Sequence, residues 1–423
     1  MDPEDRFLLC CVPTSQTEEE AKAMVQLASS GLKWPIVFLR ALREGLAGLA
    51  YWHIRRCDIE DRVLPEALSA LGRCYHEAIG ENLAAMGSLR DLLGRFETSA
   101  VPVMVLKGAA LVSSLYPGLG LRRMTDVDLL VRREDLRKAD ALLRGFGYAP
   151  VDGDPQEAAV RPVGYLSSLD YRRVSSAPRE GGNERRAGEH AGSRKIIPRP
   201  DSFHLHWHLV NSSVPAYMFA VGVDMERLWT EADQGEVSGA RFRMLAPHHL
   251  LIYLCEHALR VGHSFDRLVL FSDILEVLRV YGAALRWERV VAESVELGLH
   301  RFLFLSLSLV CGLFGPRVPE ETLLDLQRKV WPIRAGERLF LRMMLSGHRL
   351  RGLSYLAYLS LNRGLGSKCR FMARTLFPPL WVLRQRSYDS EAKPGSLYAQ
   401  RAAEVAMQAV RLAELMALGH RGP

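Results

Sequence analysis

The sequence lacks the cysteine pattern of a disulfide-bonded secreted protein or a zinc-finger protein. Its seven cysteines are odd in number and scattered along 423 residues. No pair has the Cys-x-x-Cys spacing that is typical of structural zinc sites. Scattered free thiols are best kept in a reducing compartment, and we therefore expect a cytoplasmic protein.

A run of apolar residues long enough to cross a membrane is also missing. The most apolar stretch, residues 302–315, lies between Arg301 and Arg317 and is shorter than the roughly 20 residues that a spanning helix needs. The chain begins Met-Asp-Pro-Glu-Asp, without the basic start of a secretory signal. These features predict a buried core helix at 302–315 and no membrane partner.

A surface dedicated to nucleic acid is not evident in the charge pattern. The 55 basic and 48 acidic residues give a formal charge of +7, which suits a protein that handles phosphates but is weak evidence by itself. The arginines are spread at helical spacing, and no Lys/Arg run is interleaved with aromatic residues. Nucleic acid is therefore an unlikely partner.

The residues that are present divide the chain into three predicted regions. Residues 1–97 show apolar side chains at three- and four-residue spacing, which predicts helices at 18–29, 35–57 and 63–96. Residues 98–245 contain short β-branched runs, and residues 246–423 return to the helical pattern. The sequence thus predicts a central region with strands between two helical regions. Within the central region we expect strands at 101–106, 125–131, 162–175 and 200–210 and helices at 109–115 and 133–146.

Residues 175–198 have almost no bulky apolar side chains, so they cannot bury enough surface to fold. We interpret them as a mobile hairpin insertion between two strands. A tolerated surface insertion is favoured over a substrate lid.

The pattern Asp126-Val127-Asp128 carries the strongest chemical signal. In a strand, alternate side chains share a face, so Asp126 and Asp128 lie side by side while Val127 and Leu129 face the core. Two neighbouring carboxylates repel each other unless a cation neutralises them. Mg²⁺ prefers oxygen ligands and is usually held by one or two carboxylates together with substrate phosphates. The pair is therefore a candidate magnesium site.

Groups suited to bind phosphate flank the carboxylates. Lys107 and Gly108 stand between a predicted strand and a predicted helix, where backbone N–H groups attract anions and glycine permits close approach. Arg122 and Arg123 precede the carboxylate strand, and either could hold a phosphate through two parallel hydrogen bonds.

These segments resemble the "uncharacterised nucleotidyltransferase" family of the polymerase-beta-like nucleotidyltransferase superfamily. The resemblance rests on residues 105–111 (VLKGAAL), 116–117 (YP), 122–131 (RRMTDVDLLV) and 143–148 (LRGFGY), and it extends over roughly residues 20–300. It implies an α+β fold, in which a small mixed-sheet nucleotidyltransferase core is flanked by N- and C-terminal helical regions. It also implies Mg²⁺ as cofactor and a nucleoside triphosphate as substrate, such as ATP.

The resemblance implies a third carboxylate on a later strand, two residues before a His-Trp pair. Here His206-Trp207 matches the pair, but His204 stands at the acidic position. Three readings remain: His204 takes over the role, Asp201 supplies it from a shifted register, or activity is weakened or lost.

Several histidines outside the motif permit more than one interpretation. His204, His206 and His208 alternate, so they could form a transition-metal site, but a polar cleft opposite Asp126 and Asp128 is favoured. His248, His249 and His257 lie on amphipathic helices and are expected to be packed or capping residues, and Asp273 a buried polar tie, with a minor possibility of contacting the nucleotide.

The leading hypothesis is a magnesium-dependent nucleotidyltransferase that moves a nucleoside monophosphate to an acceptor and releases pyrophosphate. The acceptor is a small molecule, peptide or polymer, by analogy with bacterial relatives. A catalytically weakened nucleotide-binding regulator or scaffold is the alternative, and RNA tailing is a third, less favoured, hypothesis.

Overall fold

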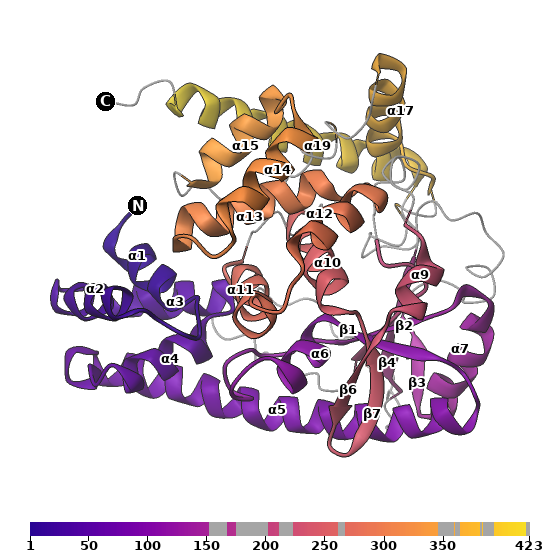
Figure 1. The fold of residues 1–423 in the computed structure, drawn as a ribbon, viewed down its shortest axis with the longest axis horizontal. Helices are drawn as coiled ribbons and strands as arrows, with labels where there is room; N and C mark the ends of the chain where they lie inside the picture. Colours follow the sequence, from indigo (N-terminus) through magenta and orange to yellow (C-terminus); the bar gives the residue numbers. More distant parts are fainter. Residues whose placement is uncertain are drawn as a thin grey trace.

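The computed structural model contains a seven-stranded mixed sheet in the order β3–β4–β5–β2–β1–β7–β6, which lies toward the lower right of Figure 1. β2 is parallel to β5 and β1 to β7, and the other neighbours are antiparallel. The strands are β1 (Val103–Leu106), β2 (Val127–Val131), β3 (Tyr148–Pro150), β4 (Ser168–Arg173), β5 (Ser202–His206), β6 (Asp233–Val237) and β7 (Ala240–Met244). The structure describes residues 1–151, 167–174, 202–210, 223–260, 267–345, 364–380 and 393–419, with the single residues 359 and 383.

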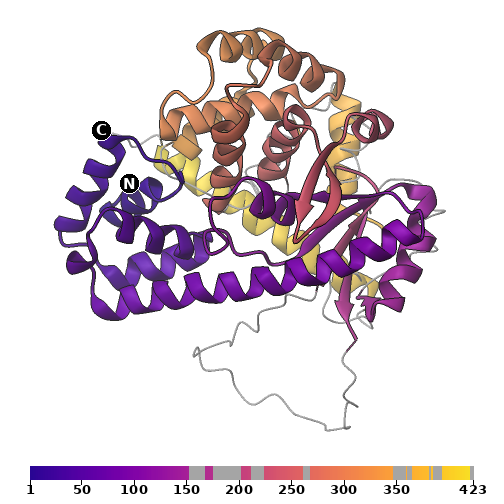
Figure 2. The ribbon, with the colours of Figure 1, turned by 60° about the horizontal axis from the view of Figure 1, so that its bottom comes forward.

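The N-terminal helices form a layer that reaches the sheet through one long helix. They are α1 (Pro3–Cys10), α2 (Glu18–Ser29), α3 (Trp34–Glu44), α4 (Ala47–Arg56) and α5 (Pro65–Thr98). Helix α2 begins at a capping box formed by Thr17 and Glu20, and α3 ends where Gly45 adopts a φ of 74°. Helix α5 has 34 residues, roughly 50 Å at 1.5 Å per residue. It contacts α3 and α4 at one end and α7, β6 and β7 at the other (Figure 2).

Shorter helices connect the strands. Helix α6 (Lys107–Ser114) follows β1 directly, and α7 (Leu136–Gly145) follows β2 through a 3₁₀ turn at Arg133–Asp135. Another 3₁₀ turn, Glu60–Arg62, precedes α5, and α9 (Met225–Thr230) precedes β6. The mainly apolar residues 107–114 therefore form a helix directly after β1.

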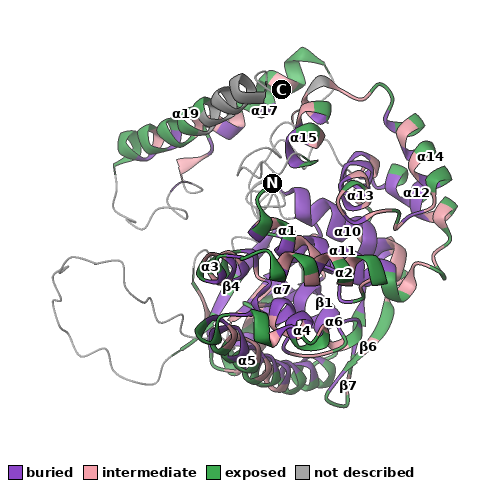
Figure 3. Cartoon of the chain, turned by 90° about the vertical axis from the view of Figure 1, so that its left-hand side faces the viewer, coloured by how far each residue is buried: buried purple, intermediate pink, exposed green. Residues whose placement is uncertain are grey.

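The C-terminal helices cover the remaining side of the molecule (Figure 1). Helices α10, α11 and α13 are the most buried of them, whereas the described part of α19 is mainly exposed (Figure 3). None of the described helices is long and apolar enough to cross a membrane. They are α10 (Pro247–Leu259), α11 (Val269–Tyr281), α12 (Trp287–Glu296), α13 (His300–Phe314), α14 (Glu320–Val330), α15 (Ala335–Leu345), α17 (Leu365–Leu376) and α19 (Pro394–Gly419).

The predicted fold class is confirmed: a mixed sheet with helical regions before and after it in the chain. The buried helix expected at 302–315 is α13. One continuous hydrophobic core runs from Phe7 in α1 to Phe371 in α17, so all three predicted regions contribute to it. The division of the chain into three regions at residues 97 and 245 stays a prediction. All seven cysteines are free thiols.

The strand predictions were right in place but too long. The strand expected at 125–131 begins at Val127, so Asp126 precedes it. The strands expected at 162–175 and 200–210 contain β4, which ends at Arg173, and β5, which ends at His206, and their residues 162–166, 175, 200 and 201 lie outside the described part of the chain. The insertion predicted at 175–198 lies outside the described residues, but the strands on either side of it, β4 and β5, do pair as antiparallel neighbours. β3, β6 and β7 were not predicted, because they are short and, in β6, largely polar.

Candidate active site

The pairing of three strands gathers the residues singled out from the sequence. The register places Leu106 of β1 opposite Asp128 of β2. It also places His204 of β5 opposite Asp128 and His206 opposite Leu130. Lys107, which follows Leu106, therefore stands beside the same carboxylate as the two histidines. Residues that are almost one hundred positions apart in the chain thus meet around one side chain.

Lys107 is the first residue of α6 and has an unusual backbone. Its φ of 44° lies in the left-handed region, which is costly for a residue with a side chain. The buried side chain points at β2, where Nζ donates a hydrogen bond of 2.7 Å to Asp128 Oδ1. Burial opposes the charge on Lys107, but Asp128 outweighs that effect and holds the lysine pKa above its ordinary value. Lys107 is therefore a fixed cation at the start of a helix.

Asp128 is the centre of the hydrogen-bond network. Only 2% of the residue is exposed, and Oδ1 accepts hydrogen bonds of 2.7 Å from both Lys107 Nζ and His206 Nε2. Burial would raise its pKa, but Lys107 and the two histidines hold the pKa of Asp128 well below its usual range. Among the described residues none donates a hydrogen bond to the second oxygen, Oδ2. Asp128 is therefore ionised, with one oxygen available.

Asp126 differs from Asp128 in its surroundings. It lies just before β2, and 43% of its side chain is exposed. Thr125 Oγ1 donates a hydrogen bond of 2.9 Å to Asp126 Oδ1. Desolvation and the neighbouring Asp128 raise the pKa of Asp126, the opposite direction from that of Asp128. Asp128 has Lys107 as a direct cationic partner and Asp126 does not, so the repulsion between the two carboxylates raises the pKa of Asp126. A bound cation would therefore stabilise the ionised form of Asp126 more than that of Asp128.

His204 lies between the aspartate pair and a carboxylate that the sequence did not point to. Its Nδ1 is 3.4 Å from Asp128 Oδ1 and 3.9 Å from Asp126 Oδ2. Its Nε2 is 2.8 Å from Ser168 Oγ and 3.4 Å from Asp170 Oδ1. Asp170 stands opposite His204 in the antiparallel pairing of β4 and β5. β5 thus carries His204 where a carboxylate was expected, and the adjacent strand β4 places the carboxylate of Asp170 beside it.

The three alternating histidines do not form one row. His206 is fully buried on Asp128, and its ring centroid lies 4.2 Å from that of His204. His208 lies beyond the end of β5, where its Nδ1 accepts a hydrogen bond of 3.2 Å from the backbone N–H of Val210. Burial lowers the pKa of His206 and of His208. Only His204 and His206 therefore belong to the aspartate cluster.

Arg122 is held on the far side of the cluster by Asp273 of α11. Arg122 Nε and one terminal nitrogen donate hydrogen bonds of 2.6 and 2.8 Å to Asp273, which also accepts one of 2.8 Å from Tyr116 Oη. The other terminal nitrogen, Nη1, lies so near Gly108 that a Cβ there would be 2.9 Å away. The expected polar tie at Asp273 is thus present, and the glycine at 108 leaves room for the third nitrogen of Arg122.

Arg123 is engaged in a similar way by α5. Its Nε and terminal nitrogen donate hydrogen bonds of 2.6 and 2.8 Å to Glu81. The neighbouring Asn82 donates to the carbonyl oxygens of Leu119 and Arg122 and accepts from the N–H of Met124. Both predicted phosphate-binding arginines therefore already hold carboxylates, and α5 fixes the loop that carries them.

These side chains line one cavity of about 530 Å³, which is within the usual range for small-molecule sites. Its wall includes both aspartates, His204, Lys107, Gly108, Arg122 and Arg123. It also includes Arg260 at the end of α10 and Arg267 before α11, which no sequence pattern indicated. Five basic side chains and two carboxylates therefore line this space, and Arg122, Arg123 and Arg260 are each also bound to a carboxylate behind the wall.

Two donor sets at or directly behind the wall of this cavity suit different metal ions. The carboxylates of Asp126 and Asp128 offer oxygen, which a hard ion such as Mg²⁺ prefers. Asp128, His204 and His206 also place one donor atom each within 4.8 Å of one another. In that second set Lys107 already occupies the shared oxygen of Asp128, so the oxygen pair is the better fit.

Sequence reasoning singled out Asp273 as a buried polar tie but missed three other polar residues. Glu81 and Asn82 position the loop, and Asp170 supports His204. These three are ordinary polar residues of a helix or strand, and nothing in their local sequence sets them apart.

Comparison with known proteins gives one finding. A family model described as "Uncharacterised nucleotidyltransferase" matches residues 30–315, more than half of the chain. This range includes every residue of the cavity wall named above. No curated protein and no solved structure matches the chain.

Proposed function

Because this chain belongs to the uncharacterised nucleotidyltransferase family, we propose that its cavity binds a magnesium nucleoside triphosphate and transfers the nucleoside monophosphate to an acceptor. The observation that carries this proposal is the strand register. It brings a lysine at a helix start, an Asp-x-Asp pair and a histidine to one wall of a cationic cavity.

The triphosphate would lie against the positive side of the cavity. The first turn of α6 offers backbone N–H groups that a helix leaves unpaired, and Gly108 allows close approach to them. Arg122 would add its Nη1, since its other two nitrogens are held by Asp273. Arg260 and Arg267 would extend the positive wall. The arginines thus serve as fixed charges rather than as mobile clamps.

Asp126 and Asp128 would hold the magnesium ion, which when bound supplies neutralisation of the phosphate charge. Asp128 would contribute Oδ2, because Lys107 and His206 occupy Oδ1. Lys107 and His206 keep Asp128 ionised and oriented before any ligand arrives. This preorganisation lowers the cost of binding, because the side chains need not reorient.

His204 would accept the proton of the attacking acceptor group. In the neutral ring, donation from Nε2–H to Ser168 or Asp170 leaves the lone pair of Nδ1 directed toward the aspartates. Asp170 would orient the ring and stabilise its protonated form, in the manner of a carboxylate behind a catalytic histidine. A histidine base with a carboxylate partner would thus replace the third carboxylate of the superfamily.

The test is calorimetric titration of ATP, GTP, CTP and UTP with Mg²⁺ into the wild type and Asp126→Asn. Asp126 is the better residue to change, because replacing the buried Asp128 also removes the partner of Lys107. We expect magnesium-dependent binding of one triphosphate to the wild type and loss of at least tenfold in affinity in the variant. Asp91→Asn, on the exposed surface of α5, is the matched control. No binding to folded wild type would refute the proposal.

A nucleotide-binding regulator or scaffold is the second candidate function, and His204 is the observation that favours it. A histidine at a position where the superfamily carries an acid is compatible with binding without turnover. Release of pyrophosphate from the bound triphosphate, measured with candidate acceptors, separates the two. Turnover that falls in His204→Gln while binding is retained supports the enzyme, whereas binding without pyrophosphate release supports the regulator.

A further inference from the structure

A second cluster of histidines and carboxylates lies at the opposite end of α10 from the cavity. His248 and His249 are in its first turn, whereas His257 and Arg260 at its other end line the cavity. The eight positions between His249 and His257 correspond to roughly 12 Å along the helix axis. Glu231, directly after α9, and Glu293 of α12 complete the cluster. None of the four residues lines the cavity.

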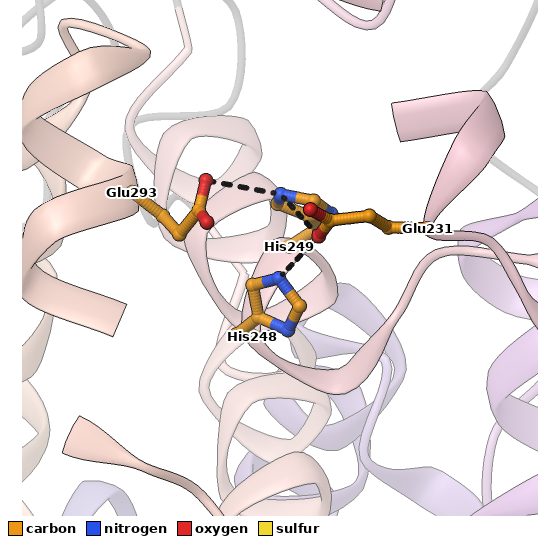
Figure 4. A group of neighbouring side chains, drawn as sticks. All are labelled: Glu231, His248, His249 and Glu293. Atoms are coloured by element: carbon orange, nitrogen blue, oxygen red, sulfur yellow. Dashed lines mark hydrogen bonds and ion pairs between the residues drawn. The ribbon is translucent and has the colours of Figure 1, made fainter. Parts of the chain in front are cut away.

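The four side chains converge on one point. Figure 4 shows Glu231 and Glu293 approaching from opposite sides, with both imidazole rings directed between them. His248 Nε2 is 3.2 Å from Glu231 Oε2. His249 Nε2 is 3.8 Å from the same oxygen and 3.5 Å from Glu293 Oε2. All four donor atoms lie within 4.8 Å of one another.

These separations match the edges of a tetrahedral metal site. Zinc bonds to imidazole nitrogen and carboxylate oxygen are about 2.0–2.2 Å long, which places neighbouring tetrahedral ligands roughly 3.3–3.6 Å apart. The three measured separations, 3.2, 3.5 and 3.8 Å, fall around that range. A hydrogen-bonded cluster would instead draw a charged acceptor and its donor to about 2.7–2.9 Å.

His249 is the member of the cluster whose bonding is least satisfied. Its side chain is fully buried, and its Nδ1 has no hydrogen-bond partner in the described part of the chain. Its Nε2 therefore makes the polar contacts of the ring, and both contacts are at or beyond the limit of a hydrogen bond. A buried polar group rarely lacks good partners unless an ion or water completes the site.

Each carboxylate of the cluster is also bound by an arginine. Arg227 donates a hydrogen bond of 2.5 Å to Glu293 Oε1, leaving Oε2 on the side of His249. Arg289 donates one of 2.6 Å to Glu231 Oε2, the oxygen that also faces both histidines, so a metal ion would bind through the second lone pair of that oxygen. Arg227 also pairs with the exposed Glu296, so the two arginines are shared among three carboxylates. The two imidazole nitrogens of the cluster favour an ion that binds imidazole well.

We propose that Glu231, His248, His249 and Glu293 form a four-ligand structural site for a zinc-like divalent transition metal that joins α9, α10 and α12. Four protein ligands leave no open position, which is typical of structural rather than catalytic sites. Arg227 and Arg289 orient the carboxylates, as residues around metal ligands commonly do.

The test uses the full chain, purified without a polyhistidine tag and stripped of metal with a chelator. Co²⁺ is titrated in and followed by visible absorption, because tetrahedral Co²⁺ has intense d–d bands, and Zn²⁺ is then added in competition. We expect a one-to-one complex with tetrahedral bands and without a thiolate charge-transfer band. His248→Gln/His249→Gln should abolish the bands, and Zn²⁺ should raise the melting temperature of the wild type only.

The matched control is His204→Gln/His206→Gln, which removes the two histidines of the aspartate cluster and should retain the bands. Glu231→Gln, at a residue whose side chain is 27% exposed, serves if the double variant does not fold. It should lower the affinity for Zn²⁺ by more than the roughly 10- to 100-fold that loss of a residue supporting a metal ligand causes. Wild type without tetrahedral bands, or bands that vanish in His204→Gln/His206→Gln but survive in His248→Gln/His249→Gln, would overturn the proposal.

Discussion

Two clusters in this protein contain the same residue types, two carboxylates and two histidines, in different settings. The cluster of Asp126 and Asp128 surrounds a buried lysine on the wall of a cavity of about 530 Å³. The cluster of Glu231 and Glu293 is enclosed by three helices and supported by two partly exposed arginines. The comparison teaches that residue type alone does not assign chemistry. The proposed substrate site borders a cavity and contains a buried lysine. The proposed metal site is enclosed by helices, and its carboxylates are bound by partly exposed arginines.

The largest expected effect is in the first cluster. Asp128→Ala leaves the buried Lys107 ammonium without its carboxylate, and breaking a buried pair costs roughly 3–5 kcal/mol. Asp126→Ala, at a half-exposed residue, should change the free energy of unfolding by less than about 1 kcal/mol. Denaturant unfolding of both variants measures the difference. Equal effects would show that Lys107 does not depend on Asp128.

Acid tests His249 of the second cluster and Asp128 of the first in different pH ranges, whereas the buried His206 beside Asp128 shares the upper range with His249. Burial lowers the pKa of His249 from 6.5 to about 4, so the unfolded chain binds a proton first and stability is lost as the pH falls from 6.5 toward 4. The pKa of Asp128 is held well below 3.8, so its contribution is retained until the pH falls below about 4. His249→Gln should flatten the upper part of a stability–pH curve and Asp128→Asn the lower part. Urea unfolding of metal-free protein at a series of pH values checks both.

Gly108 tests the phosphate side of the first cluster. A Cβ at residue 108 would lie 2.9 Å from Arg122 Nη1, and Asp273 prevents that guanidinium from moving away. Gly108→Ala should therefore weaken triphosphate binding about tenfold, or about 1.4 kcal/mol, and should also lower stability, because Arg122 or the start of α6 must shift. Calorimetry compares it with Gly94→Ala in α5, which meets nothing within 4 Å and should stabilise the helix by roughly 0.5–1 kcal/mol. Equal binding by both variants would contradict the proposed cradle.

The smallest effect is expected in the second cluster without metal. Glu231→Gln loses contacts with Arg289 and His248, but Arg289 is 39% exposed and can be solvated. The cost in metal-free protein should therefore be below about 1 kcal/mol, as for exposed pairs. With saturating Zn²⁺ the difference from the wild type should widen, because only the wild type gains the binding energy. Thermal unfolding with and without Zn²⁺ measures both values.

Local patterns predicted most of the elements. Helix α2 lies at residues 18–29, where the spacing of apolar residues placed it, and β2 starts two residues later than expected. The polar strand β6 was missed, because its stability comes from pairing with β7 and not from an apolar run of its own. Patterns of period 3.6 or 2 are local, so the sequence reveals them without a partner.

The sequence by itself determined which residues carry the candidate chemistry near β2: Lys107, Gly108, Asp126, Asp128 and His204 lie in motifs or alternating patterns. Only the tertiary structure decided what they meet. Asp273 lies 151 positions from Arg122, and Asp170 reaches His204 through strand pairing. His248 and His249 were expected to be packed or capping residues, and it is the packing of α9 and α12 that brings two carboxylates to them. Contacts of this kind depend on how elements pack, and packing is set by the whole core rather than by the residues of any one segment.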